Sequence, residues 1–251
     1  MRLTLAVLCL IANAAAQTGY RKPPQEILNV LNAPRFPQAV LSPARTHLLL
    51  VDPVGNPSIS DIAKPMLRLG GLRIDPANNG PHLTSYSVGA TIKSLSDGSE
   101  KRIAVPANAR LSSPRFSGDG RHLALLNSTR DRVELWVVDV ASARARRIEN
   151  LAVNAATMGA FDWMPDGKTL LVKSVPAGRG PVPVEAEAPV GPATQESAGR
   201  AAPVRTNPDM IRNPHEERLF EYYTTSQLTL VDAVAGTAKP VGAPDLWWSV
   251  D

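Results

Sequence analysis

Three basic side chains, Lys64, Arg68 and Arg73, stand in residues 52–85, a stretch that interrupts a regular series of short apolar segments. Ammonium and guanidinium groups bind carboxylates, and the guanidinium does so through a planar fork of donors. The three residues are therefore our candidates for contact with an acidic side chain of a substrate. The alternative, which the residues by themselves favour, is an ordinary solvated surface.

Two acidic groupings invite a metal or acid–base interpretation, but neither has suitable spacing. His215, Glu216 and Glu217 are adjacent, whereas a helical zinc motif such as H-E-x-x-H places its histidines one turn apart. Paired glutamates could grip the amino terminus of a peptide, yet a polar helix or loop surface explains them more simply. Calcium needs six to eight converging oxygens, and four aspartates stand singly in separate turns: Asp119, Asp139, Asp166 and Asp232. We predict no metal site and no cofactor.

No catalytic nucleophile is recognisable in the chain. The turn G-x-S-x-G, which exposes the serine of many hydrolases, occurs nowhere in the 251 residues. The single cysteine, Cys9, lies inside an apolar N-terminal run. We therefore predict that this chain contributes no catalytic residue.

The N-terminal stretch "MRLTLAVLCLIANAAAQ" has the parts of a secretory signal peptide. Arg2 supplies the positive charge, about ten apolar residues follow, and small residues precede Gln17. We predict a signal peptide over residues 1–16, cleavage before Gln17, and a periplasmic or secreted protein. The apolar run is too short to span a membrane, and cleavage would leave a mature chain without cysteine.

Composition favours a globular all-β chain with many turns. The sequence is 43% hydrophobic and contains 23 prolines and 17 glycines, which is too many for a helix bundle. The net charge of +4 does not predict nucleic-acid binding, because the basic residues are scattered except for the cluster "ARARRI" near residue 145.

Two short patterns repeat along the chain and predict four strands per repeat. The first pattern, "FSGDGRHLAL", recurs about 47 residues later as "WMPDGKTLLV" and in altered form as "LSPARTHLLL". The second pattern, "WVVDVASARARRI", recurs as "LTLVDAVAGTAKPV", and "TIKSLSDGSEKRI" is a looser copy. Asp and Gly in the first pattern suit a tight turn between strands. Two hairpins per repeat and this period are typical of a β-propeller blade. Tryptophans near repeat positions should pack between blades: Trp136, Trp163, Trp247 and Trp248.

The organisation predicted from these patterns has three parts. Residues 1–16 form the signal peptide, and residues 17–37 form a helical segment begun by two prolines. Residues 38–251 form an incomplete propeller, all-β and built from four-stranded blades, with long excursions at residues 52–85 and 175–210.

Four stretches resemble one family: "GYRKPPQEILNVLNAP", "LSPARTHLLLVD", "GLRIDPANNG" and "NPHEERLFEYYTTSQLTLVD", in this order. They are similar to the N-terminal propeller region of glutamyl endopeptidases, a branch of the prolyl oligopeptidase family of serine peptidases. "GLRIDP" and "NPHEERLFEYY" are the most specific. The resemblance implies a propeller that caps an α/β-hydrolase domain, admits peptides or unfolded segments, and excludes folded proteins. It also implies cleavage on the carboxyl side of Glu by an acyl-enzyme route, so that Arg73→Ala in a complete enzyme should raise KM for a Glu substrate.

The hydrolase domain of that family is not within this sequence, which leads to the expectation of a non-catalytic fragment. Peptide substrates would reach the site through the other domain, and unpaired blade edges could promote self-association. The alternative is a periplasmic propeller of the Tol type that binds protein partners and has no hydrolase. We expect neither nucleic-acid partners nor a membrane span.

Overall fold

The computed structural model describes residues 22–185 and 209–250, in two units. The first unit, residues 1–34, contains the helix α2 (Gln25–Leu31). Pro24 precedes its first turn, and the backbone N–H of Asn32 closes its last turn on the carbonyl of Leu28. Proline suits this position because the first N–H groups of a helix have no partner within the helix.

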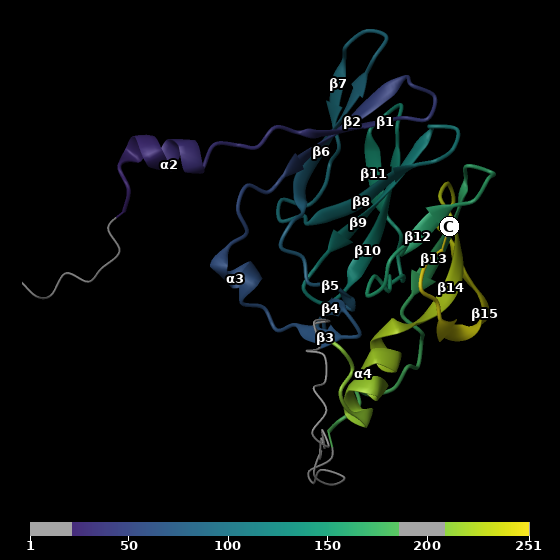
Figure 1. The fold of residues 1–251 in the computed structure, drawn as a ribbon. Coiled ribbons are helices and arrows are strands. Elements are labelled where there is room, and N and C mark those ends of the chain that lie inside the picture. Colours follow the sequence, from purple (N-terminus) through teal and green to yellow (C-terminus); the bar gives the residue numbers. More distant parts are fainter. Residues whose placement is uncertain (1–21, 186–208, 251) are drawn as a thin grey trace, which may run out of the picture. The chain divides into compact units, whose positions relative to one another are not determined.

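The second unit, residues 35–251, consists mainly of antiparallel strands that form three four-stranded blades (Figure 1). Within each blade, consecutive strands pair with one another. Blade 1 contains β1 (Gln38–Leu41), β2 (His47–Pro53), β6 (Ser87–Ser94) and β7 (Glu100–Arg102). Blade 2 contains β8 (Leu111–Phe116), β9 (His122–Ser128), β10 (Val133–Asp139) and β11 (Arg144–Arg147). Blade 3 contains β12 (Phe161–Trp163), β13 (Thr169–Ser174), β14 (Thr225–Asp232) and β15 (Ala238–Leu246).

The pairing confirms the predicted all-β fold built from four-stranded blades. Blades 1 and 2 share a single residue pair, Ser87 with Leu111, which joins their strands into one eight-stranded sheet. Blade 3 forms a separate four-stranded sheet. The four strands of each blade pair in the order in which they follow one another along the chain, which explains why they appear as one repeat in the sequence.

The repeated Asp-Gly turns join the first and second strands of blades 2 and 3. In blade 3, the Asp166 carboxylate accepts hydrogen bonds from the backbone N–H of Lys168 and Thr169, and Gly167 has a positive φ of 68°. In blade 1 the Ser42 hydroxyl takes over this role by accepting from the backbone N–H of Thr46 and His47. Local side-chain bonds therefore fix these turns, as the sequence predicts.

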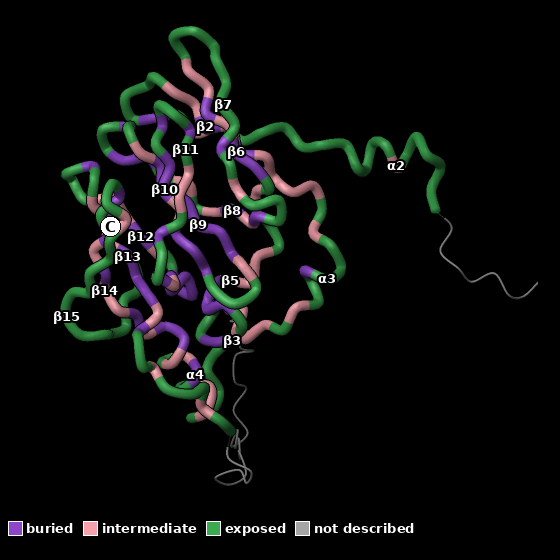
Figure 2. Tube along the Cα trace, turned by 180° about the vertical axis from the view of Figure 1, so that it is seen from behind, coloured by how far each residue is buried: buried purple, intermediate pink, exposed green. Residues whose placement is uncertain are grey.

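Apolar side chains of alternate residues form one core on each side of blade 2. Val133, Leu135 and Val137 of β10 belong to the core shared with blade 3, whereas Val138 and Val140 belong to the core shared with blade 1. Figure 2 shows the buried residues concentrated along these central strands. A strand buried on both faces needs apolar side chains at even and odd positions alike, which β10 has.

The tryptophan prediction is correct for two residues and wrong for two. Trp136 and Trp163 are partly buried and pack against the two cores. Trp247 and Trp248 follow β15 and are 37% and 53% exposed. The last strand of blade 3, β15, is exposed along its whole length. None of the three apolar clusters in the described part of the chain includes Trp247 or Trp248.

Two long inserts leave the blades between the second and third strands. Insert 1, residues 54–86, joins β2 to β6 and contains α3 (Ile59–Ile62) and a three-stranded sheet of β3 (Leu67–Leu69), β4 (Leu72–Asp75) and β5 (Gly80–Pro81). Insert 2, residues 175–224, joins β13 to β14 and ends with α4 (Pro214–Thr224). In blade 2 the equivalent connection has only residues 129–132.

Antiparallel pairing explains why the two inserts meet. Connections from second to third strands leave a blade at the same end as the connections between blades. The two inserts form a third apolar cluster with the segment between blades 2 and 3: Leu69, Ile74, Ala156, Leu219 and Tyr223. In Figure 1, α4 accordingly lies beside β3. We call this end, with the described parts of both inserts (residues 54–86, 175–185 and 209–224) and residues 103–110, 129–132 and 148–160, the insert face. None of the helices described by the structure is long and apolar enough to cross a membrane.

Candidate functional site

Two buried asparagines join the inserts to the connection between blades 2 and 3. Asn154 is fully buried, and its side-chain N–H groups donate to the carbonyls of Tyr223 (3.0 Å) and Thr225 (2.9 Å). Its oxygen accepts from the Asn79 side chain (2.6 Å) and from the backbone N–H of Ala156 (3.2 Å). Asn79 also donates to the carbonyl of Tyr223 (3.1 Å). We call this arrangement the asparagine junction. It bonds insert 1 to the end of insert 2.

Arg179 adds a second connection between the inserts. Its guanidinium donates to the Asn79 side-chain oxygen and to the carbonyl of Tyr222. It also lies 4.0 Å from the centre of the Tyr222 ring and 5.7 Å from that of Tyr223. Cation–π contact and hydrogen bonds to neutral oxygens thus hold Arg179 in place.

A buried carboxylate fixes the other side of insert 1. Asp61 accepts hydrogen bonds from Ser58 (2.8 Å) and Tyr86 (3.2 Å) and forms an ion pair with Arg110. Burial alone would raise the pKa of Asp61, but these donors and the Arg110 charge outweigh it and lower the pKa to about 2. Insert 1 is therefore attached both to the connection between blades 1 and 2 and to insert 2.

The three basic candidates from the sequence do not form one group. Lys64 lies 3.6 Å from Asp61 and lines a pocket together with Arg110 and Thr129. Arg68 and Arg73 stand opposite each other in the β3–β4 hairpin, a neighbourhood that the sequence alone did not predict. Lys64 therefore lines a pocket in which neither arginine takes part.

Arg68 and Arg73 share one carboxylate. The Asp209 oxygens lie 3.8 Å from an Arg68 nitrogen and 3.7 Å from Nε of Arg73, beyond ordinary hydrogen-bond length. Both arginine side chains are about 60% exposed, whereas the Asp209 side chain is nearly buried. Two guanidinium groups therefore share the Asp209 carboxylate.

Arg73 also lines a pocket that Arg68 does not reach. The pocket lies between insert 1, the first strand of blade 2 and the segment before blade 3. Its polar lining comes from Arg73, His82, Ser112, Ser113, Ser128 and Thr157. Apolar residues complete it, including Leu72, Leu83, Leu126 and Val133. We call it the His82 pocket.

Glu216, one of the acidic residues considered as a ligand, has a structural role. Glu216 lies in the first turn of α4, where it pairs with Arg212 and lies beside the Asn213 cap. Hydrogen bonds from Arg212 lower its pKa. Within residues 22–185 and 209–250, no three His, Cys, Asp or Glu side chains gather as a metal would require.

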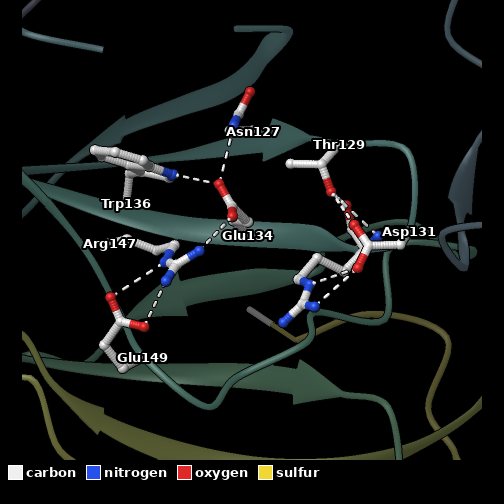
Figure 3. A network of polar contacts seen from close by, with 8 residues as sticks. Asn127, Thr129, Asp131, Glu134, Trp136, Arg147 and Glu149 are labelled. Carbon is white, nitrogen blue, oxygen red and sulfur yellow. Dashed lines mark hydrogen bonds and ion pairs between the residues drawn. The ribbon is translucent and has the colours of Figure 1, made fainter. Parts of the chain in front are cut away.

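Glu134 is the most enclosed acidic group of blade 2. Figure 3 shows it receiving hydrogen bonds from Trp136 and Asn127, both at 2.9 Å, and from Arg147, which Glu149 also contacts. Burial opposes ionisation of Glu134, but the three donors together hold its pKa below the ordinary value. Trp136, Asn127 and Arg147 all donate to Glu134, so this network stabilises the blade.

Lys173, in β13 of blade 3, is a fully buried cation. Its ammonium donates to the Thr157 hydroxyl and to the carbonyls of Met158 (2.6 Å) and Trp248 (2.9 Å). Burial lowers its pKa to about 8. Lys173 thus connects the segments on either side of blade 3.

Sequence reasoning missed Asn79, Asn154, His82 and Arg179. Only Asn79 carried a usable signal: it precedes Gly80 in "DPANNG" and adopts a positive φ of 57°, which asparagine tolerates better than most residues. The other three became candidates only through contacts with residues distant in the chain.

The sequence has close similarity to two plant proteins. It is 35% identical over 253 residues to "Probable glutamyl endopeptidase, chloroplastic" of Oryza sativa subsp. japonica, covering 95% of this chain and 27% of the relative. The protein of the same description from Arabidopsis thaliana is 35% identical over 251 residues, covering 94% and 26%. The chain therefore spans about a quarter of the length of these relatives.

Solved structures show weaker likeness. The acylaminoacyl peptidase of Pyrococcus horikoshii is 14% identical, with a TM-score of 0.42 and coverage of 86% of this chain and 26% of that one. The β-propeller domain of the Trilobed protease from Pyrococcus furiosus is 13% identical, with a TM-score of 0.38 and coverage of 83% and 44%. No protein-family model matches the chain.

The family assignment rests on sequence, and the fold on the strand pairing of the chain itself. "GLRIDP" contains β4, and "NPHEERLFEYY" contains all of α4 except Thr224, so the two most specific stretches of the resemblance build the contact between the inserts. By sequence, this chain is similar over nearly its whole length to the plant glutamyl endopeptidases, and its strand pairing makes it a β-propeller portion about a quarter as long as those relatives.

Proposed function

We propose that this chain is the non-catalytic propeller portion of a secreted or periplasmic peptidase that cleaves peptides after glutamate. The observation that supports the proposal most directly is the insert face. Two stretches shared with glutamyl endopeptidases, 140 or so residues apart, fold against each other there and are bonded through the asparagine junction. Contacts between residues so far apart in the chain hold this surface together. We attribute them to a function of the surface rather than to the stability of the blades.

The role that we propose for the insert face is control of access. The inserts are attached at both sides, through Asp61 and through the asparagine junction, so they present a fixed surface with recesses of a few hundred Å³. Such recesses suit peptide side chains, whereas a folded protein would meet the inserts first. The acyl-enzyme chemistry would belong to residues outside this sequence, since it has no G-x-S-x-G turn.

The first test is the mass and activity of the native protein. An antibody against residues 116–148 should capture a secreted product about three to four times the mass of this chain, a ratio that follows from the quarter-length coverage of the relatives. That product should hydrolyse an unfolded peptide after Glu and spare the same sequence inside a folded protein. This chain expressed alone should bind peptide without hydrolysing it.

Four results would decide against parts of the proposal. A native product of this chain's own mass, shortened only by residues 1–16, would favour a protein-binding propeller of the Tol type. Hydrolysis by this chain alone would contradict its non-catalytic role. Equal cleavage of the folded and unfolded substrates would contradict control of access, and an amino terminus other than Gln17 would contradict the predicted signal cleavage.

A further inference from the structure

Lys173 stands at a position that is apolar in the other two blades. The repeat aligns it with Val51 of β2 and Leu126 of β9, which both belong to apolar cores. Lys173 has no exposed surface either, yet its side chain ends in an ammonium group. Burial lowers the pKa of this group to about 8, so the folded protein holds the charge less readily than the unfolded chain does. The stability of the blade therefore does not explain a lysine here.

Every acceptor of the Lys173 ammonium is a neutral oxygen. The group donates to the Thr157 hydroxyl and to the Met158 carbonyl (2.6 Å), in the segment that leads into blade 3. It also donates to the carbonyls of Trp248 (2.9 Å) and Trp247 (3.4 Å), in the segment that follows β15. No carboxylate belongs to this set of four. Oxygens from two segments thus surround one cation, much as backbone carbonyls surround a potassium ion in a channel.

The segment that leaves blade 3 lies directly against the segment that enters it. The backbone N–H of Val250 donates to the carbonyl of Gly159 (3.3 Å). Gly159 has a positive φ of 58°, and a Cβ at this residue would lie 2.9 Å from Cβ of Ser249. Residues 247–250 therefore follow one closely packed path, and the Lys173 ammonium lies where this path begins.

We propose that Lys173 is a positioning residue that fixes the path of the chain out of blade 3. The Thr157 hydroxyl and the three carbonyls form a site for a small monovalent cation, and the ammonium occupies it. A buried charge is unfavourable for stability, but its requirement for several oxygens at once allows only one arrangement of the two segments. The chain leaving β15 is held in this way, whatever the activity of the protein.

The test is hydrogen exchange of the native protein and of Lys173→Met, monitored by mass spectrometry. Methionine is of similar length but has no charge and no donor. Peptides that cover residues 247–250 should exchange about tenfold faster or more in the variant, whereas β9 should change less than about twofold. This local effect distinguishes a positioning role from a contribution to overall stability, which would change both regions.

Two further variants support this comparison. Lys168→Met is the matched control, because Lys168 is an exposed lysine of the same blade, and it should leave exchange at residues 247–250 unchanged. Thr157→Val removes one of the four oxygens with little change in volume. It should accelerate exchange at residues 247–250 about threefold to tenfold, and it provides the test if the Lys173 variant does not fold.

Lys173→Ala tests the cation site itself. The truncation removes the three methylene groups and the ammonium, which correspond to one molecule of n-propylammonium. Adding n-propylammonium should restore most of the protection of residues 247–250. The neutral alcohol 1-propanol has nearly the same size and should restore little, because the four oxygens require a cation.

Each part of the proposal can fail separately. Unchanged exchange of residues 247–250 in both Lys173→Met and Thr157→Val would overturn the positioning role, and so would an equal increase in β9. No restoration by n-propylammonium, or equal restoration by 1-propanol, would overturn the cation site. None of these results bears on the proposed function, which the mass and the hydrolytic activity of the native protein test.

Discussion

Replacing Asn154 should loosen insert 2 from the blades, because this side chain makes four hydrogen bonds in a fully buried place. Asn154→Ala removes the donor to the carbonyl of Thr225 and the acceptor for the backbone N–H of Ala156. The Asn79 side-chain amide still donates its hydrogen bond to the Tyr223 carbonyl in this variant. Two backbone groups therefore lose a partner outright.

The expected loss of stability follows from that count. An unsatisfied buried polar group costs about 1–3 kcal/mol. Two such groups give about 2–6 kcal/mol, and partial relaxation brings the expectation to about 2–4 kcal/mol. A domain is stable by about 5–15 kcal/mol, so the change should be readily measured. Asn154→Asp should destabilise at least as much at pH 7, because a carboxylate would face two carbonyl oxygens.

Hydrogen exchange monitored by mass spectrometry measures the effect where it should arise. Amides of α4 should exchange faster in Asn154→Ala by a factor of about 30 or more, whereas amides of β9 should change less. Asn154→Asp should regain stability as the pH falls, because burial favours the protonated acid in the folded state. The control is Asn108→Ala, an exposed asparagine of the same face. Unchanged exchange in α4 would refute the role of the asparagine junction.

Three further changes test the blades and the hairpin. Burial lowers the pKa of Lys173 to about 8, so the unfolded chain binds more protons than the folded protein between pH 8 and 10.5. The free energy of unfolding, measured with urea, should therefore rise by up to about 3 kcal/mol over that range. Lys173→Met should lack this rise. Gly70→Ala should lower stability by about 1–3 kcal/mol in thermal unfolding, since φ is 58° and the added Cβ would lie 2.9 Å from the Phe220 ring; an unchanged Tm would contradict this. Glu134→Gln should cost about 1–3 kcal/mol at pH 7, and the cost should shrink once the pH falls below the lowered pKa of Glu134 in the folded protein, because the stabilisation by the carboxylate is lost there. A cost in urea unfolding that does not decrease as the pH is lowered would argue against the ion pair with Arg147.

Much of the fold could be predicted from the sequence because its turns depend on nearby residues. Asp166 and Gly167 act on backbone groups within three positions, so the pattern alone places the hairpin. The same holds for Asp139 and Asp232 between third and fourth strands, whose carboxylates accept from neighbouring N–H groups. Four strands per repeat follow from two such turns.

The candidate site could be predicted only in part. The sequence identified Arg73 by its charge and grouped it with Lys64, which faces another pocket. It could not identify His82, because an isolated histidine carries no sign of whether its ring nitrogen will have a partner. Trp247 and Trp248 were misjudged for a similar reason: burial depends on which neighbour lies beside a strand, and β15 has exposed residues throughout.

By itself, the sequence determined the blades, their turns and the family, because strand alternation and turn chemistry are set by residues close together in the chain. The tertiary structure decided that the two inserts meet, that Asn79 reaches the carbonyl of Tyr223 across 144 positions, and that Arg73 and His82 share one pocket. Such contacts arise only when antiparallel strands bring separate connections to the same end of neighbouring blades, and no local pattern encodes that distance.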